Sequence, residues 1–326
     1  MTSHPPRPGE RPGRLAATAT GTHLDAFGGA EWGLLAGIAL VWGASFLFID
    51  IGLDAFAPPV VTFARLALGA ATMAAFPRAR TRVDRADLPR IALLGVVWMA
   101  APLLLFPVAQ QHVDSSVAGM INGAAPLTTA VVAALLLRRL PGRWQRVGLG
   151  LGFLGVVAIG LPNVQGAEAS PFGVGLLLLA VTLYGFAFNL AVPLQQRYGS
   201  MPILLRAQLV ATVVVAPFAM TGIPASTWSW SSALAMVALG VVGTGLAFPA
   251  MTTLVGRVGG TRGSIPIYLV PVIAIGLGVF VRGEEVASIA LLGTGLVLLG
   301  AWLTSRAERR PARPVAPVAP VVDTSP

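Results

Sequence analysis

The sequence predicts an all-α integral membrane protein of about ten transmembrane helices, arranged as two inverted five-helix repeats. Of its 326 residues, 55% are hydrophobic and only 11% are charged, whereas a soluble domain carries about 25% charged residues. Apolar stretches of about 18 residues or more recur along the chain, which is the length a helix needs to cross the hydrocarbon core. Residue patterns also recur between the two halves, and this recurrence predicts the repeat.

The apolar stretches place the expected spans near 32–53, 58–77, 91–111, 116–137, 144–162, 171–193, 201–222, 232–255, 262–281 and 286–305. With ten spans, nearly all loop arginines fall on one side. The other side receives the acidic residues Asp50, Asp54 and Asp114 and a single arginine, Arg282. By the positive-inside rule the arginine-rich side is cytoplasmic. We therefore expect a multi-pass protein of the bacterial inner membrane with both termini in the cytoplasm.

Composition excludes several function classes. The net charge is +9 and no lysine or cysteine occurs. Arginines confined to short loops are typical of topology control, so we expect no nucleic-acid partner. Without lysine there is no Schiff-base or P-loop chemistry, and without cysteine no disulfide or thiolate site. We expect no cofactor, no metal site and no catalytic residue. The Pro- and Arg-rich ends, 1–31 and 306–326, are expected to be disordered cytoplasmic tails.

The two halves, 32–162 and 163–305, share a sequence pattern. Most of the matches have an offset of 145 residues, and earlier spans align at slightly smaller offsets. The matched pairs are Gly95 with Gly240, Pro126 with Pro271, Gly148 with Gly293, Gly155 with Gly300 and, earlier, Trp42 with Tyr184 and Pro59 with Pro202. Five spans per copy is an odd number, so the copies must face opposite ways in the membrane. Inverted repeats around a shared central site are a common plan for alternating-access carriers.

Four segments resemble one known family, the EamA-type branch of the drug/metabolite transporter superfamily. They are WGASFLFIDIGL (42–53), PPVVTFARLALGA (58–70), SSVAGMINGAAPLTTAVVAALLLRRLP (115–141) and GSIPIYLVPVIAIGLGVFVRGEE (263–285). The resemblance covers about residues 32–305 and implies transport of small metabolites across the membrane. The second copy ends its fourth helix with the acidic RGEE, whereas the first ends with the basic LRRLP, a departure from the acidic ending.

Arg65 is the most informative polar residue, because it lies about two turns inside the second span. An arginine facing lipid at that depth is costly, so Arg65 should face the bundle or a wet cavity. There it either binds a carboxylate-bearing solute through a bidentate contact or pairs with Asp50 or Asp54. Its repeat equivalent is the neutral Gln208, so a charged pocket here would be asymmetric.

Further polar and aromatic residues are candidates for lining a central cavity. Asn122 and Asn189 are either solute ligands or interhelical hydrogen-bond partners. Flat amphipathic surfaces come from Trp42, Trp98, Tyr184 and Tyr268, for which core packing is the alternative interpretation. Pro126 and Pro271 are symmetry mates, and each is a hinge or a fixed kink.

The sequence favours a secondary transporter of small metabolites, such as amino acids or drug-like amphipathic compounds. Its partners are then a small-molecule solute and the lipid bilayer, and a homodimer through the Gly-rich fifth and tenth spans is compatible with the pattern. The alternative is an integral-membrane enzyme that acts on a lipid-linked or diphosphate substrate, with Asp50 and Asp54 holding Mg²⁺. One carboxylate pair on a face nearly bare of arginine is weak support for that chemistry.

Overall fold

The computed structural model describes residues 18–109, 112, 121–164, 170–273 and 288–306. Within these residues every regular element is a helix, and each of the ten expected spans contains one. The first half contains α1 (Gly29–Leu53), α2 (Pro58–Ala74), α3 (Leu88–Leu94), η3 (Gly95–Ala100), α4 (Ala101–Ala109), α6 (Ala125–Leu137) and α7 (Arg143–Val164). The second contains α8 (Pro171–Tyr198), α9 (Ser200–Gly222), α10 (Trp230–Ala238), η5 (Leu239–Leu246), α11 (Ala247–Val258), α12 (Gly260–Gly263), a helical stretch over 266–273, and α14 (Ser288–Thr304).

The outer surface of this bundle is apolar. Leu135, Val213 and Leu291 are 72%, 72% and 61% exposed on the outward sides of their helices. By length and composition, four helical stretches in the described part of the chain are able to cross a membrane: Arg85–Phe106, Pro171–Tyr198, Ser200–Ala225 and Trp230–Val258. Large exposed apolar surfaces of this kind need a lipid or protein environment.

The third span of each half contains a segment of π-helix at the same repeat position. The segment η3 begins at Gly95 and η5 begins one residue before Gly240, its mate at the 145-residue offset. Each glycine lies against the second helix of the opposite half. A Cβ on Gly95 would meet the carbonyl oxygen of Ala207 in α9, and a Cβ on Gly240 would lie 2.5 Å from Leu68 Cβ in α2. The two halves are thus interlocked through a related pair of contacts.

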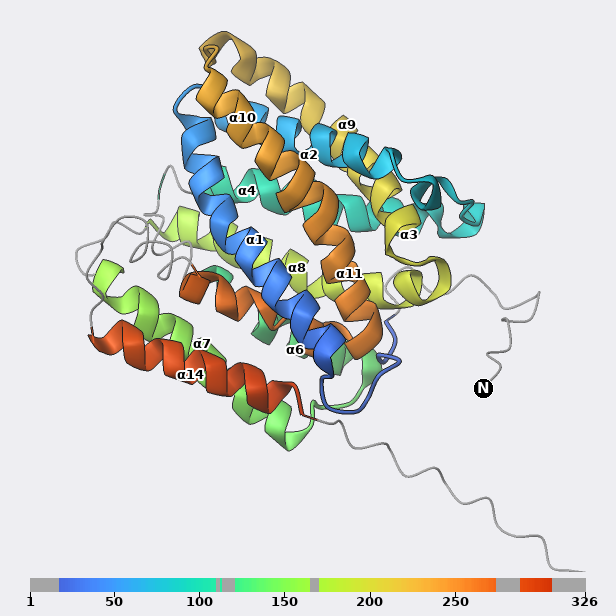
Figure 1. The fold of residues 1–326 in the computed structure, drawn as a ribbon, viewed down its shortest axis with the longest axis vertical. Coiled ribbons are helices and arrows are strands. Elements are labelled where there is room, and N and C mark those ends of the chain that lie inside the picture. The colour runs from blue at the N-terminus through green and yellow to red at the C-terminus, as the bar shows by residue number, and fades with distance from the viewer. Residues whose placement is uncertain (1–17, 110–111, 113–120, 165–169, 274–287, 307–326) are drawn as a thin grey trace, which may run out of the picture.

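Glycines also set the contact between α7 and α14, the most extensive helix pair, which lies along one edge of the bundle (Figure 1). A Cβ on Gly155 would lie 2.6 Å from the Gly293 carbonyl oxygen, and one on Gly293 would lie 2.7 Å from the Gly155 carbonyl oxygen. Side chains at these positions would push the backbones apart, so the glycines permit the close approach.

Residues 18–28 form a strap across one end of the bundle. Arg262 donates hydrogen bonds to the carbonyl oxygens of His23 (3.1 Å) and Asp25 (2.6 Å), and Phe27 N donates to Ser305 O (3.1 Å). We call this end, where the strap and the last turn of α14 meet, the terminal face. The sequence predicts a disordered tail over 1–31, and the structure differs over 18–31 because these partners order the chain and α1 begins at Gly29. Residues 1–17 and 307–326 lie outside the described residues.

Candidate functional site

Arg65 is buried among the helices of both halves. Pro58 starts α2, and Arg65 lies two turns later with only 9% of its surface exposed. Its Nε donates to Thr244 Oγ1 of η5 at 3.3 Å, which is a long hydrogen bond. Within the described residues its two Nη atoms have no hydrogen-bond partner and the guanidinium forms no ion pair. Asp54 is exposed and unpaired with Arg65, and the Asp50 side chain lies outside the described set. The positive charge is therefore held in the bundle without a described counter-ion.

The repeat mate of Arg65 converges on the same residue. Gln208 Nε2 donates to the Thr244 carbonyl oxygen at 3.3 Å, and Gln208 is fully buried. Gly69 makes room for this amide, since a Cβ there would lie 2.8 Å from Gln208 Oε1. Thr244 Oγ1 in turn donates to Leu239 O, five residues earlier, as the wide π turn allows. The second helices of both halves thus meet at one residue of a π segment.

A chain of aromatic rings continues from this point through the centre of the bundle. Trp42 packs on Phe248 (5.4 Å between centroids), and Trp98 packs on Phe248 (5.3 Å) and on Phe188 (5.2 Å). Tyr184 stacks on Phe188 at 6.2 Å, and it interacts electrostatically with Arg65. Trp42 Nε1 donates to Gly243 O of η5 at 3.1 Å. Three predicted aromatic residues, Trp42, Trp98 and Tyr184, therefore belong to one chain of rings. This chain reaches the surroundings of Arg65 at Tyr184 and, through Trp42, at Gly243 next to Thr244.

The other predicted ligands lie elsewhere. Asn189 is 1% exposed and its amide nitrogen donates to Thr129 O (3.0 Å) and Gly185 O (2.8 Å), which is an interhelical link between α8 and α6. Tyr268 is fully buried and its hydroxyl donates to Leu149 O of α7 at 2.9 Å. Asn122 is partly exposed and forms no hydrogen bond with a described residue. Arg65, Gln208 and the three aromatic residues are thus brought together, while Asn122 and Tyr268 are not part of this group.

The fourth span of each half is interrupted near its start. In the first half, a turn at 123–124 precedes α6, and Pro126 occupies the first turn of that helix. In the second half, the turn lies at 264–265, so the following helical stretch begins at Pro266 and Pro271 lies inside it. Each half thus has a break at the start of its fourth span. In the second half this break directly precedes Pro266, five residues before Pro271. Pro126 and Pro266 lie in the first turn after the break, where a proline loses no hydrogen bond.

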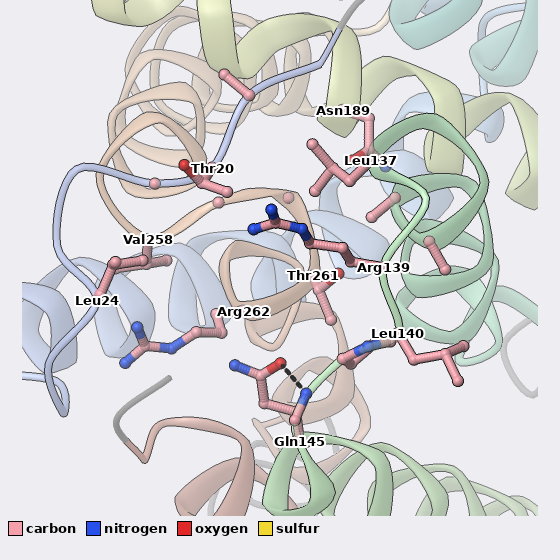
Figure 2. Close-up of a pocket in the computed structure, with 18 of the residues that line it drawn as sticks. Thr20, Leu24, Leu137, Arg139, Leu140, Gln145, Asn189, Val258, Thr261 and Arg262 are labelled. Atoms are coloured by element: carbon pink, nitrogen blue, oxygen red, sulfur yellow. Dashed lines mark hydrogen bonds between the residues drawn. The ribbon is translucent and has the colours of Figure 1, made fainter. Parts of the chain in front are cut away.

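A cavity of about 530 Å³ opens at the terminal face (Figure 2). Its walls are the strap, the end of α6, the start of α7, and the connection between α11 and α12. Asn189 also lines it, and Thr18 of the strap donates to the Asn189 carbonyl oxygen at 2.8 Å. Asn189 directly follows Phe188 in α8, so this helix contributes both to the cavity and to the aromatic chain.

We call the group formed by Arg65, Gln208, Thr244 and the aromatic chain the central site. Several of its residues were not predicted from the sequence. Thr244, Phe188 and Phe248 connect the predicted residues, yet none was a candidate. The available signal was the Gly243-Thr244-Gly245 triplet, in which one polar residue stands between two glycines inside an apolar span. Both glycines face neighbouring helices closely, since Cβ atoms there would lie 3.0 Å from Ser45 Oγ and 2.8 Å from Thr72 Cβ.

An apolar helical bundle with two interlocked halves and a buried cation between them is the architecture of an integral membrane solute carrier. Family comparison agrees, because the model of the EamA-like transporter family matches residues 31–161 and again residues 171–306. The chain belongs to the EamA-like transporter family, and it is a multi-pass membrane protein with two repeats of membrane helices.

Individual relatives are distant but matched over nearly their whole length. A "Probable terminal-alkyne amino-acid exporter" of Streptantibioticus cattleyicolor is 26% identical over 85% of this chain and 93% of its own. The "Uncharacterized inner membrane transporter YedA" of Escherichia coli K12 is 25% identical over 84% of this chain and 90% of its own. One solved crystal structure superposes with a TM-score of 0.67 at 18% identity, covering 83% of this chain and 94% of that one, and this likeness shows the fold.

Proposed function

We propose that this transporter exports small amphipathic metabolites that carry a carboxylate, amino acids and their relatives among them. The observation that carries the proposal is Arg65, whose guanidinium is buried between the halves with one long hydrogen bond and no described counter-ion. A carboxylate would accept two parallel hydrogen bonds from the guanidinium and neutralise its charge. The rings of Tyr184, Trp42 and Trp98 supply an apolar surface for the rest of the solute.

Alternating access gives the mechanism of this export. Arg65 and Gln208 belong to opposite halves and both contact Thr244 of η5. A rocking of one half against the other would open the region around Thr244 to one side of the membrane and then to the other, as inverted repeats allow. Within the described ranges, the π segments and the breaks at 123–124 and 264–265 depart from regular α-helix, and we expect them to deform during this rocking. We place the terminal face in the cytoplasm, following the arginine distribution, which makes outward movement export.

The name of the Streptantibioticus relative supports export of amino-acid-like solutes over the enzyme alternative.

Reconstituted transport tests the proposal. Purified protein in proteoliposomes is loaded with unlabelled amino acids, and counterflow of radiolabelled amino acids is compared with that of their carboxamides. We expect saturable counterflow of the acids and little of the amides, because the amide lacks the charge that pairs with Arg65. Equal flux of both, or turnover of a lipid diphosphate without solute flux, would contradict the proposal.

A further inference from the structure

A left-handed residue at the end of α6 shapes the cavity at the terminal face. Arg138 ends α6 in the left-handed conformation (φ 52°), and it is the one described residue other than glycine with a positive φ. This turn carries the chain from α6 into α7 within a few residues. It brings Arg139 to the middle of the cavity, between Leu137 and Thr261 (Figure 2). The basic LRRLP segment of the first half is therefore part of the wall of this cavity.

The charge of the cavity is one-sided. Arg139, Arg143 and Arg262 line it, and no acidic residue is among its described lining residues. Arg262 holds the strap through His23 and Asp25. The side chain of Arg139 has no hydrogen bond or ion pair with a described residue, and the Arg143 guanidinium stacks on Trp144 at 4.8 Å. Two guanidinium groups are thus available to an anion.

The start of α7 adds further donors. This helix has 22 residues, and the residue before it is Gly142, which has no side chain to cap the first N–H groups. Gln145 accepts from Gly142 N at 3.2 Å through Oε1. Its Nε2 has no partner among the described residues, although Gln145 is only 3% exposed and lines the cavity. A long helix N-terminus with uncapped amides and nearby arginines is a favourable place for an anion.

We infer that this cavity is a second solute site, which binds the carboxylate of the transported metabolite before it reaches Arg65. The inference rests on the proposed function. Asn189 lines the cavity and directly follows Phe188 of the aromatic chain, so α8 contributes to both the cavity and the central rings. The basic LRRLP segment lines this cavity, so an anion is attracted at the terminal face, which favours loading there. The acidic RGEE segment of the second half lies outside the described residues.

Tryptophan resonances separate this site from the central one. The chain has seven tryptophans, of which Trp144 lines the cavity and Trp98 lies in the aromatic chain. Full-length protein labelled with 5-fluorotryptophan is placed in phosphatidylcholine nanodiscs, and its ¹⁹F signals are assigned by Trp→Phe substitutions. N-acetyl-L-phenylalanine is the carboxylate probe and its carboxamide is the neutral control. The variants are Arg139→Gln, Arg143→Gln, Arg65→Gln and the matched control Arg146→Gln, an exposed arginine of α7 that does not line the cavity.

We expect the carboxylate, and not the amide, to shift the Trp144 signal in the wild type, in R146Q and in R65Q. The dissociation constant read from this signal should rise about fivefold in R139Q and in R143Q, as losing one exposed ion pair implies. Unchanged signals of the other tryptophans in R139Q show that the variant is folded.

Three results would overturn the inference. If the probe shifts Trp98 and leaves Trp144 unchanged, the loading site is absent while the proposed function stands. If R139Q and R143Q bind as tightly as R146Q, the arginines are only topology determinants. If phosphatidylglycerol nanodiscs shift Trp144 without probe and the probe does not compete, the anion is a lipid headgroup and the cavity does not load solute. If the probe shifts the Trp144 signal of the wild type and leaves the Trp98 signal unchanged, the central site at Arg65 is refuted instead.

Discussion

Replacing Arg65 by glutamine separates a structural arginine from one that binds solute. Within the described residues the guanidinium has a single hydrogen bond, to Thr244 Oγ1 at 3.3 Å. A bond of that length contributes at most about 1 kcal/mol to stability. Removing a buried charge without a described counter-ion also relieves a desolvation cost. The free energy of unfolding of the Arg65→Gln variant should therefore be at most about 1 kcal/mol below that of the wild type, or above it.

The same substitution should weaken solute binding strongly. A bidentate guanidinium–carboxylate contact contains two charge-assisted hydrogen bonds, each of about 1.5–3 kcal/mol. Loss of one such bond corresponds to about a 10- to 150-fold increase in the dissociation constant, since 1.4 kcal/mol is a factor of ten. Isothermal titration of detergent-purified protein with an amino acid and with its carboxamide measures this directly. The wild type should prefer the acid, and the variant should bind both alike.

Arg65→Lys is the matched control, because it keeps the charge and removes the fork geometry. We expect intermediate affinity for the acid. The reasoning would be refuted if Arg65→Gln lost several kcal/mol of stability while keeping its preference for the acid, because Arg65 would then be a packing residue.

Two further substitutions test the packing. Gly155→Ala should destabilise the protein by about 1–3 kcal/mol in thermal unfolding, because the new Cβ would lie 2.6 Å from the Gly293 carbonyl oxygen. Gly150→Ala is its control and should be neutral or stabilising, since nothing lies within 4 Å; equal effects of the two would contradict the close α7–α14 contact. Asp87→Asn should cost about 3–5 kcal/mol, because this carboxylate is 1% exposed and accepts from two arginines and a tyrosine. The Asp84 carboxylate is half exposed and 3.5 Å from Arg197, so Asp84→Asn should lower the free energy of unfolding by less than about 1 kcal/mol. A similar loss for both substitutions would show that the buried Asp87 network does not stabilise the contact between the start of α3 and the end of α8.

The positions of the helices could be predicted from sequence because apolar length and arginine placement are local signals. The same holds for the glycine pairs: Gly95 and Gly240 match at a fixed offset, and they are the first residue of η3 and the second residue of η5. The burial of Arg65 followed from the cost of exposing a guanidinium to lipid. The offset between the glycines did not predict that the backbone at both positions is π-helical.

Other parts of the site depend on contacts between distant segments, which periodicity does not encode. Thr244 is central because two helices from opposite halves reach it, and nothing in its neighbours along the chain reveals that. The strap was missed because its order comes from Arg262, some 240 residues later in the chain. The sequence also offered no reason to single out Pro266, which directly follows the turn at 264–265, whereas Pro126 and Pro271 stood out through their shared offset.

Accessibility of one introduced cysteine tests alternating access around the central site most directly. The chain has no cysteine, so Tyr184→Cys provides a single thiol beside Arg65. Oriented proteoliposomes are treated with a membrane-impermeant maleimide from either side, with and without a carboxylate solute. We predict modification from both sides, slowed by the solute, with its two rates shifting in opposite directions when a solute gradient is imposed. Modification from one side only, whatever the gradient, would contradict a site that the two halves expose in turn.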